Sequence, residues 1–161
     1  MIPYDRSYIN NRPILLVEDN PDEIMLITRA LKKSCENIQL YTVMDGAQAI
    51  EFLSHLEMHL QNDPATTSLI ILLDLKLPKK SGFEVLRWIR SRNEIKRLPV
   101  IIFTSSNQES DVKKAYDYNA NSYIVKPVSF GELVYIADMN LKYWFDVSLL
   151  PSVMVNKINE Q

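Results

Sequence analysis

Acidic, hydroxyl and amine side chains follow four short apolar runs in this sequence. The runs are residues 14–17, 69–73, 100–103 and 123–125, and the polar residues after them are Glu18, Asp19, Asp74, Thr104 and Lys126. Apolar runs of this kind are typical of strands buried on both faces of a parallel sheet. Since open α/β folds place their chemistry at the carboxyl edge of the sheet, we expect these side chains to meet there.

Three carboxylates held close together repel each other, and a divalent cation with oxygen ligands is the usual remedy. Mg2+ suits a sparse site of this kind, because it keeps several of its waters. With Thr104 and Lys126 nearby, Asp74 has the surroundings of a phosphoryl acceptor that would carry an acyl phosphate. The simpler alternatives are that Glu18 and Asp19 only cap a helix, and that Thr104 and Lys126 are ordinary strand-end residues.

The elements that must position these side chains alternate along the chain. Amphipathic segments separate the apolar strands, and a weaker strand is expected at 39–43, which indicates an α/β fold. Right-handed crossovers and a switch in strand order would give a doubly wound parallel sheet with the first and third strands adjacent. Glu18, Asp19 and Asp74 would then lie together.

Local signals predict several helix limits. One helix starts at Asn20-Pro21, and residues 57–67 are expected to be a helix end followed by a long loop. Residues 105–111 open a further helix, which ends near Asn119, a residue that tolerates the left-handed conformation. The last helix has Ser129 as its N-cap and runs to about Phe145.

Composition limits the class of protein. A chain of 161 residues with 47% hydrophobic residues fits one globular domain, and a net charge of −2 argues against a general nucleic-acid or membrane-surface binder. A single cysteine, Cys35, excludes an internal disulfide and is expected to pack in a helix. His55 and His59 have metal-ligand spacing but no third ligand nearby, which favours two solvated histidines. Without a membrane span or a signal peptide, a cytoplasmic protein is expected.

Five segments resemble the receiver domain of two-component response regulators, in the family's order and spacing. They are residues 17–20 (VEDN), 72–78 (LLDLKLP), 82–86 (GFEVL), 103–105 (FTS) and 122–127 (SYIVKP). The resemblance implies a flavodoxin-like sheet of five parallel strands in the order 2-1-3-4-5, with five helices. It implies a receiver domain at 13–145, between an N-terminal extension at 1–12 and a C-terminal tail at 146–161.

The resemblance also implies roles for the residues at the strand ends. Asp74 would accept a phosphoryl group from a histidine kinase, with Mg2+ as cofactor, which Mn2+ or Ca2+ can replace. The cation would be held by Glu18, Asp19, Asp74 and the backbone carbonyl of Lys76. Glu18 stands where many members have aspartate, and its longer side chain can place a water between carboxylate and cation. Glu18, the 57–67 loop and the aromatic C-terminus most resemble the stand-alone regulators that partner phytochrome-type kinases.

Further residues are assigned to the switch by the same resemblance. Thr104 and Lys126 would bind the phosphoryl oxygens, and Tyr123 would turn inward as Thr104 engages them. The Lys126–Pro127 peptide bond would be cis, a state that proline makes accessible.

The last helix carries two apolar stripes, although covering a sheet requires only one. The second stripe comprises Ile136, Met139, Tyr143 and Phe145, and it predicts a homodimer through this helix and the C-terminal region. The alternative is that the tail folds back over the stripe. Residues 146–161 are too few for a DNA-binding output domain, so we expect a stand-alone receiver whose output is a phosphorylation-dependent protein contact.

Two other functions compete with this interpretation. A metal-dependent phosphohydrolase forming an aspartyl-phosphate would want a general acid two residues after the nucleophile, where this chain has Lys76. A binding module that had lost phosphorylation would show substitutions at the acceptor, threonine or lysine position, and none is present. We therefore expect a phospho-acceptor signalling protein and not an enzyme.

Overall fold

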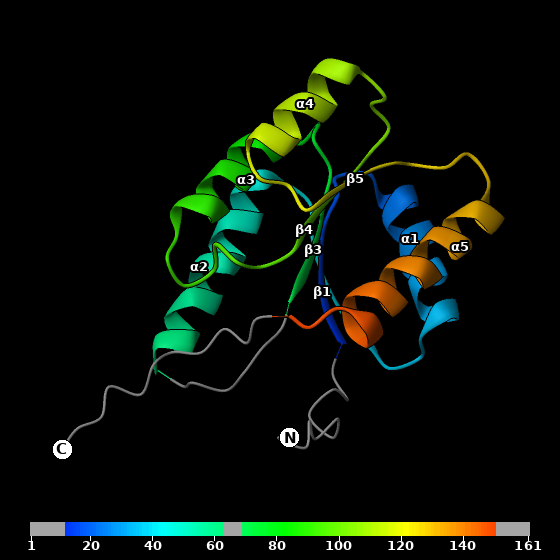
Figure 1. The fold of residues 1–161 in the computed structure, drawn as a ribbon, viewed down its shortest axis with the longest axis horizontal. Helices are drawn as coiled ribbons and strands as arrows, with labels where there is room; N and C mark the ends of the chain where they lie inside the picture. Colours follow the sequence, from blue (N-terminus) through cyan, green and yellow to red (C-terminus); the bar gives the residue numbers. More distant parts are fainter. Residues whose placement is uncertain (1–11, 63–68, 151–161) are drawn as a thin grey trace.

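The computed structural model describes residues 12–62 and 69–150, which form a sheet between two layers of helices (Figure 1). The strands are β1 (Arg12–Val17), β2 (Ile38–Val43), β3 (Ile70–Leu73), β4 (Val100–Thr104) and β5 (Ser122–Val125). The helices are α1 (Pro21–Ser34), α2 (Gly46–Asn62), α3 (Gly82–Ser91), α4 (Glu109–Asp117), α5 (Phe130–Leu141) and the π-helical η2 (Lys142–Val147). All strand pairs are parallel, in the order β2-β1-β3-β4-β5, which confirms the predicted topology.

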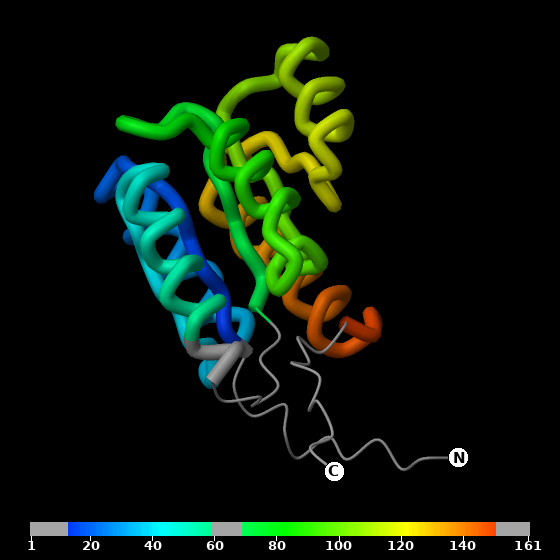
Figure 2. Tube along the Cα trace, turned by 90° about the vertical axis from the view of Figure 1, so that its left-hand side faces the viewer, coloured from blue at the N-terminus to red at the C-terminus, as the bar shows by residue number. Residues whose placement is uncertain are grey.

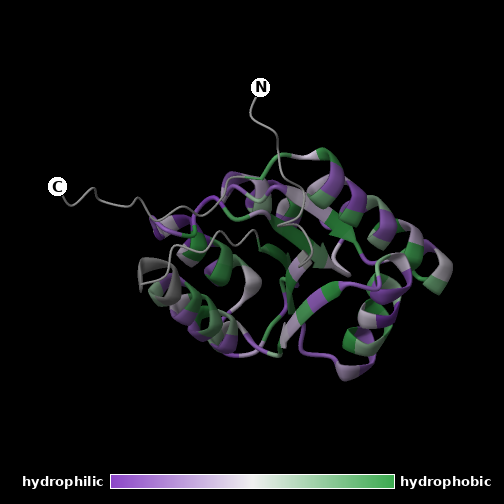
Figure 3. Cartoon of the chain, turned by 90° about the horizontal axis from the view of Figure 1, so that it is seen from below, coloured by the Kyte–Doolittle hydropathy of each residue, from purple (hydrophilic) through white to green (hydrophobic). Residues whose placement is uncertain are grey.

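Helices cover both faces of the sheet. The helices α1 and α5 lie side by side on one face, and α2, α3 and α4 lie on the other (Figures 1 and 2). Along β1, Ile14 and Leu16 join the core under α1 and α5, whereas Leu15 and Val17 join the core on the opposite face. Burial on both faces explains why the central strands are apolar throughout, as their colouring shows in Figure 3.

The predicted helix caps are present in the structure. The Asn20 side chain accepts hydrogen bonds from the N–H groups of Asp22 and Glu23 at 2.9 and 3.3 Å. Ser129 caps α5 by accepting from the Glu132 N–H at 3.1 Å. Asn119, after α4, has the left-handed φ of 62° expected of it. Local sequence therefore fixes where the chain turns away from the carboxyl edge after β1.

The helix α2 ends at Asn62, within the 57–67 segment where a helix end followed by a loop is predicted. Its Glu57 carboxylate is buried and accepts two hydrogen bonds from Arg92, at 3.0 and 2.8 Å to Oε2. A buried carboxylate is tolerated only with such a partner, so Arg92, just after α3, stabilises the last part of α2. The expected loop at 63–67 lies outside the described residues.

Two other helix limits fall within or close to their predicted positions. The helix α4 begins at Glu109, because residues 105–108 form a hydrogen-bonded loop instead of a first turn. The last helix passes Phe145 as expected but changes from α to π geometry at Lys142, and the Ser148 N–H donates to the Tyr143 carbonyl at 2.6 Å. None of the helices in 12–62 and 69–150 is both long and apolar enough to cross a bilayer.

Candidate functional site

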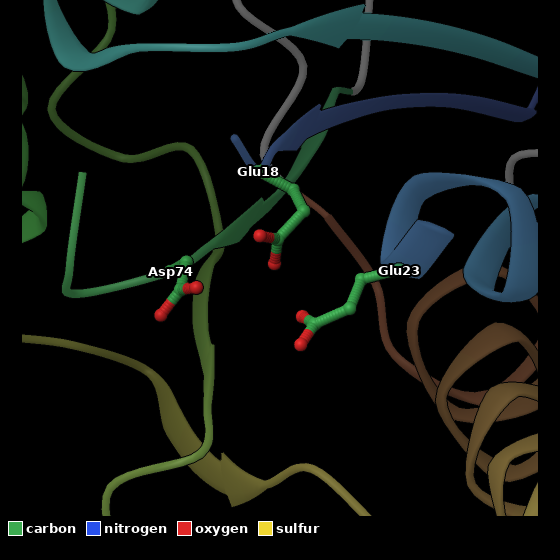
Figure 4. A group of neighbouring side chains, drawn as sticks. All are labelled: Glu18, Glu23 and Asp74. Carbon is green, nitrogen blue, oxygen red and sulfur yellow. The ribbon is translucent and has the colours of Figure 1, made fainter. Parts of the chain in front are cut away.

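Three carboxylates converge at the carboxyl edge of the sheet. Glu18 follows β1, Asp74 follows β3, and Glu23 lies in the first turn of α1. One oxygen from each lies within 4.8 Å of the other two, and the side chains point toward one another (Figure 4). The parallel pairing of β1 with β3 brings the first two together, and the Asn20 cap directs the start of α1 over the same edge.

Lys126 occupies the centre of this cluster. Its Nζ donates to Glu18 Oε2 at 2.5 Å, to Asp74 Oδ2 at 2.9 Å and to the Glu23 carboxylate. Its side chain is only 12% exposed, and its N–H donates to the Thr104 carbonyl at 2.8 Å. The predicted ammonium therefore faces the predicted acceptor carboxylate from the end of β5, which β4 separates from β3.

Burial and charge oppose each other in this cluster. Burial raises the pKa of Glu18 to about 7, although the Lys126 hydrogen bond and charge act to lower it. Burial alone would lower the pKa of Lys126, but hydrogen bonds to Glu18, Glu23 and Asp74 together raise it above its usual value. Ionised, three carboxylates around one ammonium leave two negative charges in excess, the charge that a divalent cation would neutralise.

Close backbone packing holds Asp74 in place. Its Oδ1 accepts from the Leu75 N–H at 2.7 Å, and its own N–H donates to the Val17 carbonyl at 3.1 Å. A Cβ at Gly82 would lie 2.1 Å from the Asp74 carbonyl oxygen, so only glycine fits where α3 begins. The loop after Asp74 is therefore tied to both the sheet and the helix that follows.

The Thr104 hydroxyl connects to a network on the neighbouring loop. The Ser106 N–H donates to Thr104 Oγ1 at 3.4 Å, and Ser106 Oγ donates to the Asp111 carboxylate at 2.5 Å. Tyr123 Oη donates to the Ser106 carbonyl at 2.9 Å. Thr104 is fully buried, so a change at its hydroxyl has a direct route through Ser106 to Tyr123 and to α4.

The structure brings together most, but not all, of the predicted site residues. Glu18, Asp74 and Lys126 meet as expected, whereas Asp19 is not part of the carboxylate cluster that the structure contains. Glu23 takes its place in that cluster, although the pattern of polar residues at strand ends did not predict it. The Asn20-Pro21 helix start could have identified it, because a helix beginning there places Glu23 in the first turn beside the strand end. Cation binding by Asp19 and by the Lys76 carbonyl stays a prediction.

The predicted cis bond between Lys126 and Pro127 is not found. The described residues contain no cis peptide bond. For a bond before proline the trans form is favoured by about 0.5–1 kcal/mol, and Lys126 contacts the carboxylates with this bond trans.

The residues of the predicted dimer stripe divide into two groups. Met139 and Tyr143 are 52% and 53% exposed, whereas Ile136 and Phe145 pack partly against the core under α1 and α5. Packing against the chain's own core explains part of the excess apolar surface on this helix. His55, from the predicted histidine pair, is exposed, and the side chain of His59 lies outside the described residues.

Comparison with known proteins places this geometry in a family. The response regulator receiver domain profile matches residues 14–138. The chain is 35% identical over 139 residues to the response regulator Rcp1 of Synechocystis sp., covering 86% of this chain and 92% of Rcp1. It is also 35% identical over 131 residues to the probable methanogenesis regulatory protein FilR2 of Methanothrix harundinacea, covering 81% of this chain and 82% of FilR2.

Solved structures agree with the sequence comparison. The crystal structure of the phosphorylated cyanobacterial phytochrome response regulator RcpA has a TM-score of 0.76 at 38% identity, covering 88% of this chain and 99% of RcpA. That of the Mn2+-bound form of Rcp1 has a TM-score of 0.74 at 35% identity, with the same coverage. With its strand order, acidic cluster and facing lysine, the chain belongs to the response regulator receiver domain family and is related to phytochrome response regulators.

Proposed function

We propose that this chain is a phospho-acceptor that receives a phosphoryl group on Asp74 from the phosphohistidine of a phytochrome-type histidine kinase. The observation that carries the proposal is the buried Asp74 carboxylate at the end of β3, with Lys126 Nζ 2.9 Å from its Oδ2. Support for the kinase class comes from the relatives, since RcpA is named a phytochrome response regulator. Receiver domains act in signalling, which is consistent with a switch whose output is a protein contact.

The transfer is a displacement at phosphorus. An Asp74 carboxylate oxygen forms a bond to phosphorus while the bond from phosphorus to the histidine nitrogen breaks, and that nitrogen keeps the electron pair. The Lys126 ammonium stabilises the negative charge on the phosphoryl oxygens, and the Thr104 hydroxyl donates a hydrogen bond to one of them. Reversal of the signal follows when water attacks phosphorus and the Asp74 carboxylate leaves.

The residues present fit a divalent cation, and we propose Mg2+. The cluster offers carboxylate oxygens only, and its two excess negative charges match the charge of the ion. Glu18, Asp19, Asp74 and the Lys76 carbonyl would hold it, with Mn2+ or Ca2+ as substitutes. Bound Mg2+ supplies positive charge beside the phosphoryl oxygens. An Mn2+-bound structure of the relative Rcp1 supports this choice.

The readout of phosphorylation would pass through Thr104. When the Thr104 hydroxyl turns to the phosphoryl group, it gives up the hydrogen bond from the Ser106 N–H. Ser106 also binds Tyr123 and Asp111, so its movement changes the position of the Tyr123 ring and the start of α4. The surface that changes would therefore lie over α4 and β5.

We also propose that the chain forms a homodimer through the exposed part of the last helix. Tyr135, Met139 and Tyr143 are the exposed large apolar residues on α5 and the start of η2, at 64%, 52% and 53%. Replacing Met139 and Tyr143 by aspartate should lower the mass measured by sedimentation equilibrium. An unchanged mass would contradict a dimer through this surface.

The acceptor role is tested by incubating the protein with Mg2+ and acetyl phosphate, followed by intact-mass measurement. We expect one added phosphoryl group in the wild type and none in Asp74→Asn. Asp117→Asn, which changes a carboxylate in α4, should be labelled like the wild type. Labelling of Asp74→Asn, or none in the wild type, would contradict the proposal.

The kinase class is tested separately with a purified, phosphorylated phytochrome-type kinase as donor. Transfer of the phosphoryl group to the wild type but not to Asp74→Asn is expected. Labelling by acetyl phosphate without transfer from the kinase would overturn the partner while leaving the acceptor role in place.

A further inference from the structure

The hydrogen-bonding capacity of Lys126 is fully used in this structure. An ammonium has three N–H donors, and those of Lys126 go to Glu18, Glu23 and Asp74. A phosphoryl group on Asp74 would need at least one of these donors. One carboxylate must therefore release Lys126 before the ammonium can bind the phosphoryl oxygens.

The three carboxylates differ in how readily they can give up this hydrogen bond. The side chains of Glu18 and Asp74 are 2% and 9% exposed, so either would become a buried charge unless the proposed cation took the place of the ammonium. Glu23 is 37% exposed and extends from the first turn of α1, where water can replace the ammonium (Figure 4). Asp74 is also the residue that carries the phosphoryl group, so it stays beside Lys126 in either state.

We infer that Glu23 is a positioning residue that holds Lys126 in the unphosphorylated protein and competes with the phosphoryl group for it. The inference rests on the proposed function, because it assigns Glu23 a role in the same reaction. Glu23 keeps the ammonium within the cluster until a phosphoryl group displaces it. The competition lowers the affinity of the site for a phosphoryl group.

Beryllium fluoride, a stable analogue of the phosphoryl group, tests this competition at saturating Mg2+ by calorimetric titration. Glu23→Ala removes the competing carboxylate, and it should bind the analogue roughly two- to fivefold more tightly than the wild type, as expected for loss of a part-exposed ion pair. Glu23→Gln should lie between the two, since its amide keeps an acceptor but no charge. The half-saturating concentration of acetyl phosphate should fall in the same order.

Asp22→Ala is the matched control for these variants. Asp22 is exposed in the same first turn of α1, and its loss changes the net charge equally, but it takes no part in the cluster around Lys126. Its affinity for the analogue should equal that of the wild type, because solvent screens an exposed charge. Equal tightening by Asp22→Ala and Glu23→Ala would overturn the inference in favour of a general charge effect.

Mn2+ affinity, measured without the analogue, separates the remaining explanations. Tighter analogue binding in Glu23→Ala, with Mn2+ binding unchanged or slightly weaker because one negative charge is lost, is the expected result. Weaker Mn2+ and weaker analogue binding would make Glu23 an aid to the cation and overturn its competing role. Failure of the wild type to bind the analogue or to be labelled on Asp74 would instead contradict the proposed function, whatever Glu23 does.

Discussion

Each edge of the sheet has a cation with several hydrogen-bond acceptors around it, but the two sets of acceptors differ in charge. At the amino edge, Arg90 donates to the carbonyls of Asn119, Lys96 and Leu98 at 2.9, 2.9 and 3.0 Å, and to Asn121 Oδ1 at 2.8 Å. At the carboxyl edge, Lys126 donates to three carboxylates. Burial lowers the pKa of Arg90, whereas the carboxylates around Lys126 raise its pKa.

The charge of the acceptors distinguishes the structural role of Arg90 at the amino edge from the reactive site around Lys126 at the carboxyl edge. Four neutral acceptors match the rigid fork of a guanidinium and place no negative charge against Arg90. Three carboxylates exceed the charge of one ammonium, so the carboxyl edge stays ready to bind a further cation. Hydrogen bonds from a cation thus hold the loops in place at the amino edge. At the carboxyl edge they are made to carboxylates that can exchange Lys126 for another cation.

Replacing Arg90 by methionine should give the largest change in stability. The variant leaves carbonyls of the loops before β4 and β5 without their donor, and we expect it to lose about 2–4 kcal/mol of unfolding free energy. Urea denaturation measures the loss, with the exposed Arg97→Met as a control that should change little. A loss no larger than that of the control would mean that the amino edge does not depend on Arg90.

Replacing Lys126 by methionine should change how stability depends on divalent cations. Without the ammonium, the three carboxylates repel each other more strongly and bind Mg2+ more tightly. A tenfold gain in affinity would make saturating Mg2+ add about 1.4 kcal/mol more to the unfolding free energy of the variant than to that of the wild type. Thermal melting over a series of Mg2+ concentrations measures this. Equal cation effects in both proteins would show that Lys126 and the ion do not share the cluster.

Asp45 tests whether a charge at the carboxyl edge can also be structural. The hydrogen bond from the Gln48 N–H at 2.7 Å, assisted by Lys79 at 3.3 Å, holds the pKa of Asp45 below its usual value of 3.8. A lowered pKa stabilises the folded state above pH 3.8, and this contribution is lost as the pH falls through the folded-state pKa. Asp45→Asn should therefore melt at a lower temperature than the wild type at neutral pH.

Measuring the melting temperature of Asp45→Asn at several pH values tests the predicted pH dependence. The difference in melting temperature between Asp45→Asn and the wild type should shrink on acidification below pH 3.8, because asparagine cannot titrate. A difference that stays constant with pH would mean that Asp45 acts without its charge. We expect this to be the smallest of the three effects.

Much of the fold could be predicted because its signals are local in the chain. The apolar strands have to be continuous when both faces are buried, and Asn20, Asn119 and Ser129 determine turns within a few residues of themselves. The contact that stabilises the last part of α2 could not be found in this way. It depends on Glu57 meeting Arg92, a residue 35 positions further along the chain.

The candidate site also has parts that local sequence predicts and parts that depend on distant contacts. The sequence by itself determined that Glu18, Asp74 and Lys126 follow apolar strands, and parallel strands bring such ends to one edge. Only the tertiary structure decided that Glu23 and not Asp19 completes the carboxylate cluster, and that Lys126 reaches it from a trans peptide bond. The reason is physical: strand ends are positioned by backbone pairing, which follows from pattern, whereas the contacts of a long side chain depend on every element packed around it.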